Sequence, residues 1–149
     1  MKITKKWLER KNACNEGLNW FTDNYKSIDG IELVNILKKI DLDWTSWLIV
    51  RIMNRKQCIQ YSVYAAKQVL KNFEKKHPDD KRPREAIDAA QKCIENDTKK
   101  NRAAAYAAYA SSAAYASSSA YAAYASYAAA KKRMKLKILN FGIKLLTNK

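Results

Sequence analysis

The sequence predicts an all-α protein, an antiparallel helical bundle or short helical solenoid of about six to seven helices, one of them long and rich in alanine and tyrosine. Only three Gly and two Pro occur among 149 residues, too few for the turns of an all-β protein. Apolar residues recur at helical spacing through most of the chain. Residues 103–130 contain only Ala, Tyr and Ser, and alanine has the highest helix propensity.

Three helices are predicted in the first third of the chain. Residues 4–25 are expected to form the first, because apolar side chains recur there on one helical face. A shorter second helix is predicted within residues 26–43, with Ser27 or Asp29 as its N-cap. Residues 43–54 have apolar side chains almost all round, as a buried helix has. The face of the first helix consists of Trp7, Cys14, Leu18, Phe21 and Tyr25.

Two further helices are predicted in the middle of the chain. Residues 55–75 repeat the apolar pattern until His77-Pro78, which does not allow a regular continuation. The next helix begins inside "DDKRPREAIDAAQKC", where Asp79 or Asp80 can cap its start. Pro83 is compatible with a first turn, because its missing N–H has no partner there.

The run 103–130 contains sixteen Ala, six Tyr and six Ser, and we expect one long helix over 99–130. At about 100° per residue most of the tyrosines fall on one face. This face can pack against a neighbouring helix, bind a partner or form a homodimer. The composition does not favour a membrane span. The tyrosines of this face are Tyr106, Tyr109, Tyr121, Tyr124 and Tyr127.

Positive charge is concentrated at the C-terminal end of a chain whose formal net charge is +15. Residues 131–149 carry seven Lys or Arg and no acid, and are predicted to form a basic amphipathic helix that packs on or extends from a single helical domain over 1–130. Such a helix can cap the core, or bind an acidic protein, nucleic acid or an anionic membrane. Core capping is the favoured interpretation.

No pattern of catalytic or metal-binding residues is present in the sequence, so we expect no enzyme activity, cofactor or metal. The chain has one His, no C-x-x-C pair, and too little glycine for a nucleotide-binding loop. Its three cysteines are interpreted as small core residues. No apolar signal-peptide segment follows the first residues, so a cytoplasmic protein is expected.

"DDKRPREAIDAAQ" is the most informative stretch. It can be a helix start held by ion pairs between its own charged residues, which is the favoured interpretation. Alternatively, Arg82 and Arg84 at a helix N-terminus can clamp a phosphate or a carboxylate.

This stretch, followed by the alanine-rich segment, resembles a family of small helical proteins of bacteria and phages described as putative immunity proteins. The family motif is of the type Asp-x-Arg-Pro-Arg-x-Ala-Ile, and the resemblance covers about residues 61–130. It implies a non-enzymatic protein that binds and neutralises another macromolecule. The positions that carry the motif here are Asp80, Arg82, Pro83, Arg84, Ala86 and Ile87.

The functional prediction is therefore an immunity-type or inhibitor protein that binds an acidic protein surface. The alternative is a phage or bacterial nucleic-acid-binding protein that uses residues 131–149 together with Lys99, Lys100 and Arg102. A membrane partner is not favoured. The predicted partner-binding residues are Tyr106, Tyr109, Tyr121, Tyr124, Tyr127, Lys131, Lys132 and Arg133.

Overall fold

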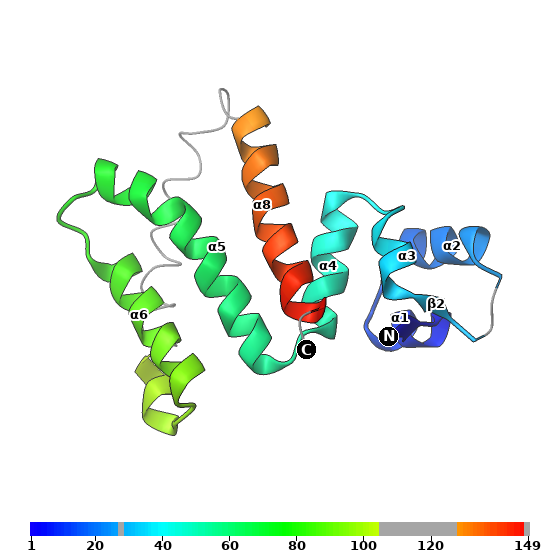
Figure 1. Ribbon diagram of the computed structural model, residues 1–149, viewed down its shortest axis with the longest axis horizontal. Helices are drawn as coiled ribbons and strands as arrows, with labels where there is room; N and C mark the ends of the chain where they lie inside the picture. Colours follow the sequence, from blue (N-terminus) through cyan, green and yellow to red (C-terminus); the bar gives the residue numbers. More distant parts are fainter. Residues whose placement is uncertain (27–28, 105–127, 148–149) are drawn as a thin grey trace. The chain divides into compact units, whose positions relative to one another are not determined.

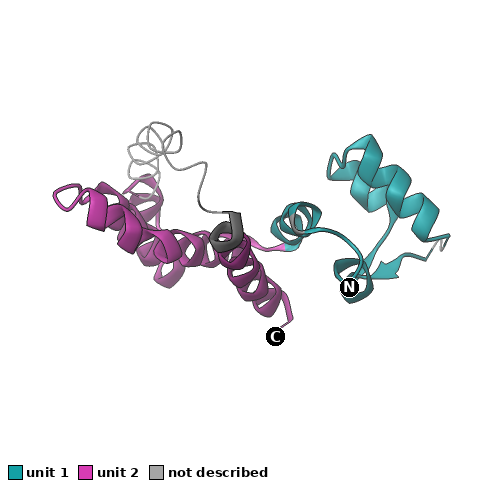
Figure 2. Ribbon diagram, turned by 90° about the horizontal axis from the view of Figure 1, so that it is seen from above, with its two compact units in different colours: residues 1–52 teal, residues 53–149 magenta. Residues whose placement is uncertain are grey.

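The computed structural model describes residues 1–26, 29–104 and 128–147 (Figure 1). Helices dominate these residues, which confirms the predicted all-α class, and the β structure described among them is one two-stranded sheet. The chain forms two compact units, Met1–Ile52 and Met53–Lys149, which Figure 2 colours teal and magenta. Each unit is described on its own.

The first unit contains short helices and the two strands. The prediction of one helix over 4–25 is wrong, because the chain breaks into α1 and α2 between Arg10 and Asn15. Asn12 adopts a φ of 57°, a left-handed conformation that a helix cannot continue through. Cys14 then caps α2, its Sγ accepting from the Gly17 N–H at 3.4 Å. The elements are β1 Lys2–Ile3, α1 Lys5–Arg10, α2 Asn15–Asn24, β2 Ile31–Glu32, α3 Leu33–Leu37 and α4 Leu42–Ile52.

The second predicted helix is shorter than expected. Residues Ile31–Glu32 form β2, which pairs antiparallel with β1 so that Ile31 lies opposite Ile3. Only α3 follows, and its N-cap is Glu32 rather than Asp29. Ser27 lies outside the described residues. Residues that the apolar pattern predicted to be helical therefore form a strand pair instead.

The core of the first unit is built from side chains of β1, α1, α2, α3 and α4. Trp20 packs edge-on against Trp44 with ring centroids 5.7 Å apart. Arg51 of α4 lies over the ring of Trp47 at 3.9 Å and donates from Nε to the Lys11 carbonyl oxygen at 3.2 Å. The buried members of this core are Ile3, Leu8, Phe21, Ile36 and Leu48.

The second unit contains the long helices, which Figure 1 draws in green and orange to red. They are α5 Arg55–Lys76, α6 Arg82–Glu95 and α8 Ala128–Thr147, and residues 99–104 are also helical. Asn54 and Gln57 start α5 with a reciprocal capping box. The predicted helix over 55–75 is confirmed, and so is the one that begins inside "DDKRPREAIDAAQKC", with Pro83 in the first turn of α6. The prediction of Asp79 or Asp80 as its N-cap is wrong, because Lys81 occupies that position.

Helices α5 and α6 share a core whose buried residues are Val63, Leu70 and Ile87. On another face of α5, the Tyr64 ring stacks on Phe141 of α8 with centroids 3.9 Å apart. Gln57 Nε2 donates to the Leu145 carbonyl oxygen at 2.6 Å. Because an early α5 residue meets a late α8 residue, the two helices run antiparallel. The division into a domain over 1–130 and a helix over 131–149 stays a prediction.

The long helix predicted over 99–130 is described only at its ends. Residues 99–104 are helical, and α8 begins at Ala128. Residues 105–127 lie outside the described residues. Of the three cysteines, Cys93 is buried and Cys58 is half-buried, whereas Cys14 is exposed, so the interpretation as a core residue is wrong for Cys14.

Candidate functional site

The motif segment lies where α6 begins, and its first ion pair is local. Arg82 donates from Nε and Nη2 to the two carboxylate oxygens of Asp80, at 2.9 and 2.7 Å. Asp80 Oδ1 also accepts from the backbone N–H of Arg82 at 3.1 Å. The Asp80 carboxylate therefore satisfies one of the N–H groups at the start of α6, although Lys81 occupies the N-cap position.

The second ion pair of the motif joins two helices. Arg84 donates from Nε and Nη2 to the two carboxylate oxygens of Glu74, both at 2.7 Å. Glu74 lies in the last turns of α5, so this bidentate pair closes the loop between α5 and α6. Arg82 and Arg84 both hold carboxylates of the protein itself, which favours a helix start held by ion pairs over a clamp for an external anion. The expectation that these pairs stay within the stretch is wrong for Arg84, because its partner lies on α5.

These contacts lower the pKa of both carboxyl groups. The pKa of Glu74 lies below its usual range because Arg84 hydrogen-bonds to the charged form, and the same contact raises the pKa of Arg84. The pKa of Asp80 is lowered because Arg82 hydrogen-bonds to its charged form. Each carboxylate therefore stabilises the folded state above the ordinary pKa of its group. This stabilisation is lost as the pH falls through the lowered pKa.

We expect Glu74→Gln to destabilise the protein at neutral pH, because the ion pair with Arg84 is lost. The effect should be modest, because the side chains of Glu74 and Arg84 are both partly exposed to solvent. The difference between wild type and variant should shrink as the pH falls below the ordinary pKa of a glutamate and through the lowered pKa of Glu74, where Glu74 of the wild type becomes protonated. Urea unfolding at a series of pH values measures it. A difference that stays constant over this range would contradict the assignment of the ion pair.

The predicted partner-binding residues fall mostly in the part of the chain that is not described. Tyr106, Tyr109, Tyr121, Tyr124 and Tyr127 lie outside the described residues, and so does the side chain of Lys131. Lys132 and Arg133 are exposed on α8. This site therefore stays a prediction.

The basic residues on the other side of the alanine-rich run are exposed as well. Lys99 and Lys100 are exposed, and Arg102 forms an ion pair with Asp97, its Nε 3.0 Å from the carboxylate Oδ1. The same Asp97 carboxylate lies 3.5 Å from Arg55 at the start of α5. Two arginines of this unit thus converge on one acid.

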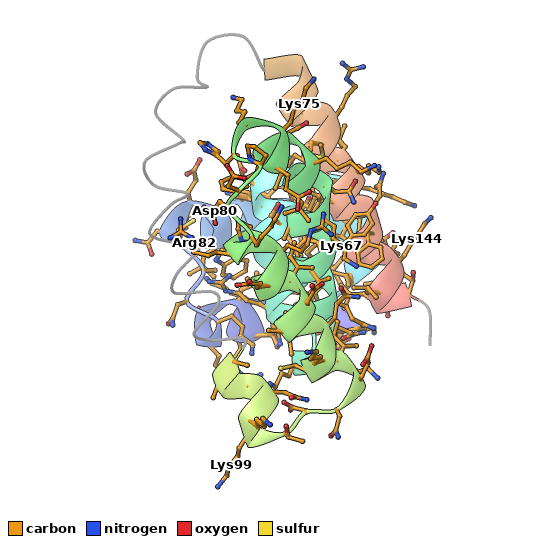
Figure 3. The ribbon with its side chains drawn as sticks, turned by 90° about the vertical axis from the view of Figure 1, so that its left-hand side faces the viewer. Lys67, Lys75, Asp80, Arg82, Lys99 and Lys144 are labelled. Atoms are coloured by element: carbon orange, nitrogen blue, oxygen red, sulfur yellow. The ribbon has the colours of Figure 1, made fainter. Side chains whose placement is uncertain are left out.

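A surface that the sequence analysis missed is the row of basic side chains on α5 and α8. Figure 3 labels Lys67 and Lys75 on α5 and Lys144 on α8. Residues 53–149 contain 20 Lys or Arg against seven Asp or Glu, whereas residues 1–52 contain nine against seven. The basic character of residues 55–76 can be read from the sequence, but that this helix lies beside α8 cannot.

The first unit holds an apolar cavity of about 400 Å³, which the sequence analysis also missed. Phe21 and the helix over 43–54 were predicted to be buried, whereas Trp20 and Ile36 were not singled out, and periodicity does not indicate where packing leaves space. Its size is that of a site for a small apolar molecule or a single side chain. The aromatic and large aliphatic residues that line it include Trp20, Phe21, Trp44, Trp47, Ile36 and Leu48.

The described part of the chain contains no group of three or more His, Cys, Asp or Glu placed to hold a metal ion. Within the same residues, none of the helices combines the length and the apolar character that crossing a membrane requires.

Comparison with known proteins adds one finding. The model of a family described as Imm-5 like putative immunity protein matches residues 49–133, more than half of the chain. The matched range contains α5, α6 and the motif from Asp80 to Ile87. No curated protein and no solved structure matches the chain.

Proposed function

Since this chain belongs to the Imm-5 like putative immunity protein family, we propose that it binds and neutralises a macromolecular partner without being an enzyme, and that this partner is a protein. The observation that carries the proposal is the family match over 49–133, which includes the motif at the start of α6. An inhibitor of this kind acts by covering its target. It needs a stable surface rather than a reactive group.

The architecture of the second unit suits such a role. The core between α5 and α6, the bidentate pair between Glu74 and Arg84, and the stack of Tyr64 on Phe141 hold three helices together. A prearranged surface loses less conformational entropy on binding than a flexible one. The proposed contact residues are the tyrosines of the alanine-rich run with Lys131, Lys132 and Arg133, since tyrosine is enriched among energetically important interface residues.

Affinity capture and co-expression together test the proposal. The tagged chain is incubated with nuclease-treated bacterial lysate, and retained proteins are identified by mass spectrometry at two salt concentrations. Each retained protein is then expressed in a bacterial host with and without the chain. We expect one protein to be retained and its toxicity to the host to disappear on co-expression. Retention of proteins whose effects on growth are unchanged by the chain would overturn the proposal.

The tyrosine residues have a test of their own. Replacing Tyr121 and Tyr124 by alanine should weaken capture of the partner by about 30-fold or more if they act as interface residues of ordinary strength. Thermal unfolding of the variant should stay close to wild type. If capture is unchanged and the melting temperature falls, the tyrosines belong to the core, and the partner binds elsewhere.

The positive charge of residues 53–149 supports one alternative, a nucleic-acid-binding protein. Its affinity for duplex DNA would fall steeply with salt, with a slope set by the number of phosphates neutralised. Fluorescence anisotropy with a labelled duplex at several salt concentrations measures this slope. Binding that survives nuclease treatment of the lysate argues for the protein partner instead.

A further inference from the structure

Two helices that pack directly on each other carry almost only positive charge. The sequence of α5 contains six Lys or Arg and one acid, and that of α8 contains six and no acid. The helices are held side by side by the stack of Tyr64 on Phe141 and by the hydrogen bond from Gln57 to the Leu145 carbonyl. Twelve positive charges thus share one helix pair with a single carboxylate.

Six of these residues form a surface that we call the polybasic face. On α5 they recur every four residues, and on α8 at intervals of four and seven, so each row follows one side of its helix. At about 100° per residue, measured from Tyr64 and Phe141, both rows fall on one side of the antiparallel pair except for Lys75, which lies close to the line of contact. All six side chains are exposed. The polybasic face consists of Lys67, Lys71, Lys75, Arg133, Lys137 and Lys144.

The protein supplies little negative charge to balance this face. Glu74, the one acid of α5, is held by Arg84 in a bidentate pair. Among the described residues, no carboxylate lies within ion-pair distance of any member of the polybasic face. Like charges four residues apart on a helix destabilise it. The face therefore carries an electrostatic cost that an oppositely charged partner would remove.

We propose, resting on the proposed function, that the polybasic face docks an acidic surface of the protein partner. Five of its six residues are lysines, point charges that attract carboxylates at long range and accelerate association. Four of the five arginines of this unit are engaged away from the face, in ion pairs with Asp80, Glu74 and Asp97, so Arg133 is the one arginine that the face offers for bidentate binding of phosphate. The Tyr64 ring is stacked on Phe141 rather than presented to a base. These features favour an acidic protein over nucleic acid.

Two triple variants with the same change in net charge test this surface. The polybasic variant is Lys67→Gln, Lys71→Gln and Lys75→Gln. The control variant is Lys5→Gln, Lys6→Gln and Lys26→Gln, which replaces exposed lysines of the first unit. Both are compared with wild type as full chains, first as bait in nuclease-treated lysate and then by surface plasmon resonance against the protein that wild type retains.

We expect the polybasic variant to associate with that protein at least about tenfold more slowly than wild type at low salt, and the difference to shrink at high salt. The control variant should stay within about twofold of wild type. Circular dichroism should find the melting temperature of the polybasic variant equal to or above that of wild type, since repulsion within α5 is relieved. A loss of binding by a variant that still folds would then be caused by the change to the polybasic face.

The possible failures are distinguishable. If the polybasic variant binds the retained protein as fast as wild type does, the polybasic face is not the docking surface, while the proposed function stands. An equal loss in both variants would mean that net charge matters and this surface does not, which also overturns the inference. If wild type retains only nucleic acid, and nothing after nuclease treatment, both the docking proposal and the proposed function are overturned.

Discussion

Replacing Leu70 by alanine is expected to lower the free energy of unfolding by about 2–5 kcal/mol. Leu70 is 8% exposed and lies between α5 and α6, where it packs in one cluster with Val63 and Ile87. Its removal leaves a cavity among side chains that can relax only in part. Urea unfolding followed by far-UV circular dichroism measures the change.

Val69 supplies a matched control on the same helix. It precedes Leu70 but is 50% exposed, so Val69→Ala should change the free energy of unfolding by no more than about 0.5 kcal/mol. Two substitutions one residue apart are thus expected to differ severalfold. Equal losses for the two would contradict the orientation of α5 against α6, and with it the alignment of Glu74 with Arg84.

Replacing Gly30 by alanine is expected to lower the free energy of unfolding by about 1–3 kcal/mol. Gly30 has a φ of 82°, a conformation that residues with a Cβ rarely adopt. An added Cβ would lie 2.8 Å from the carbonyl oxygen of Ile3, which is backbone of β1 and cannot move without disturbing the strand pair. Thermal unfolding measured by calorimetry gives the size of the loss.

The same substitution by alanine is expected to have the opposite effect at Gly17. It lies inside α2, and an added Cβ would find its nearest neighbour, Cys14 Sγ, at 3.5 Å, an ordinary contact. Gly17→Ala should therefore stabilise the protein by about 0.5–1 kcal/mol, since glycine is unfavourable inside a helix. If both glycine substitutions destabilise the protein equally, the left-handed conformation of Gly30 is not the reason why Gly30→Ala lowers the free energy of unfolding.

Most of the helices could be predicted because their signals are local. Helices α5 and α6 have an apolar face of period 3.6 and a recognisable end or beginning, at His77-Pro78 and at Pro83. The first helix was predicted too long for a related reason. The apolar spacing continues across residues 11–14. The break between α1 and α2 depends on the backbone angle φ of Asn12, which the spacing of apolar residues does not predict.

The features of the candidate sites that depend on neighbouring residues could likewise be predicted, and those that depend on distant residues could not. The charged motif and the excess of positive charge could be predicted from the residues, because each is a property of composition over a short stretch. The acid that pairs with Arg84 could not, since Glu74 lies ten residues away and on another helix. Nor could the polybasic face, because it requires α5 and α8 to be neighbours although more than fifty residues separate them.

Composition and periodicity thus establish the all-α class, the long helices of the second unit and the strongly basic character of the chain. Folding in three dimensions establishes the pairing of β1 with β2, the contact of Tyr64 with Phe141, and the partners of Arg82 and Arg84. The physical reason is the distance along the chain over which each interaction acts. Helix propensity and the apolar repeat act within a few residues of chain, whereas strand pairing and helix packing join residues that approach each other only after the chain has folded.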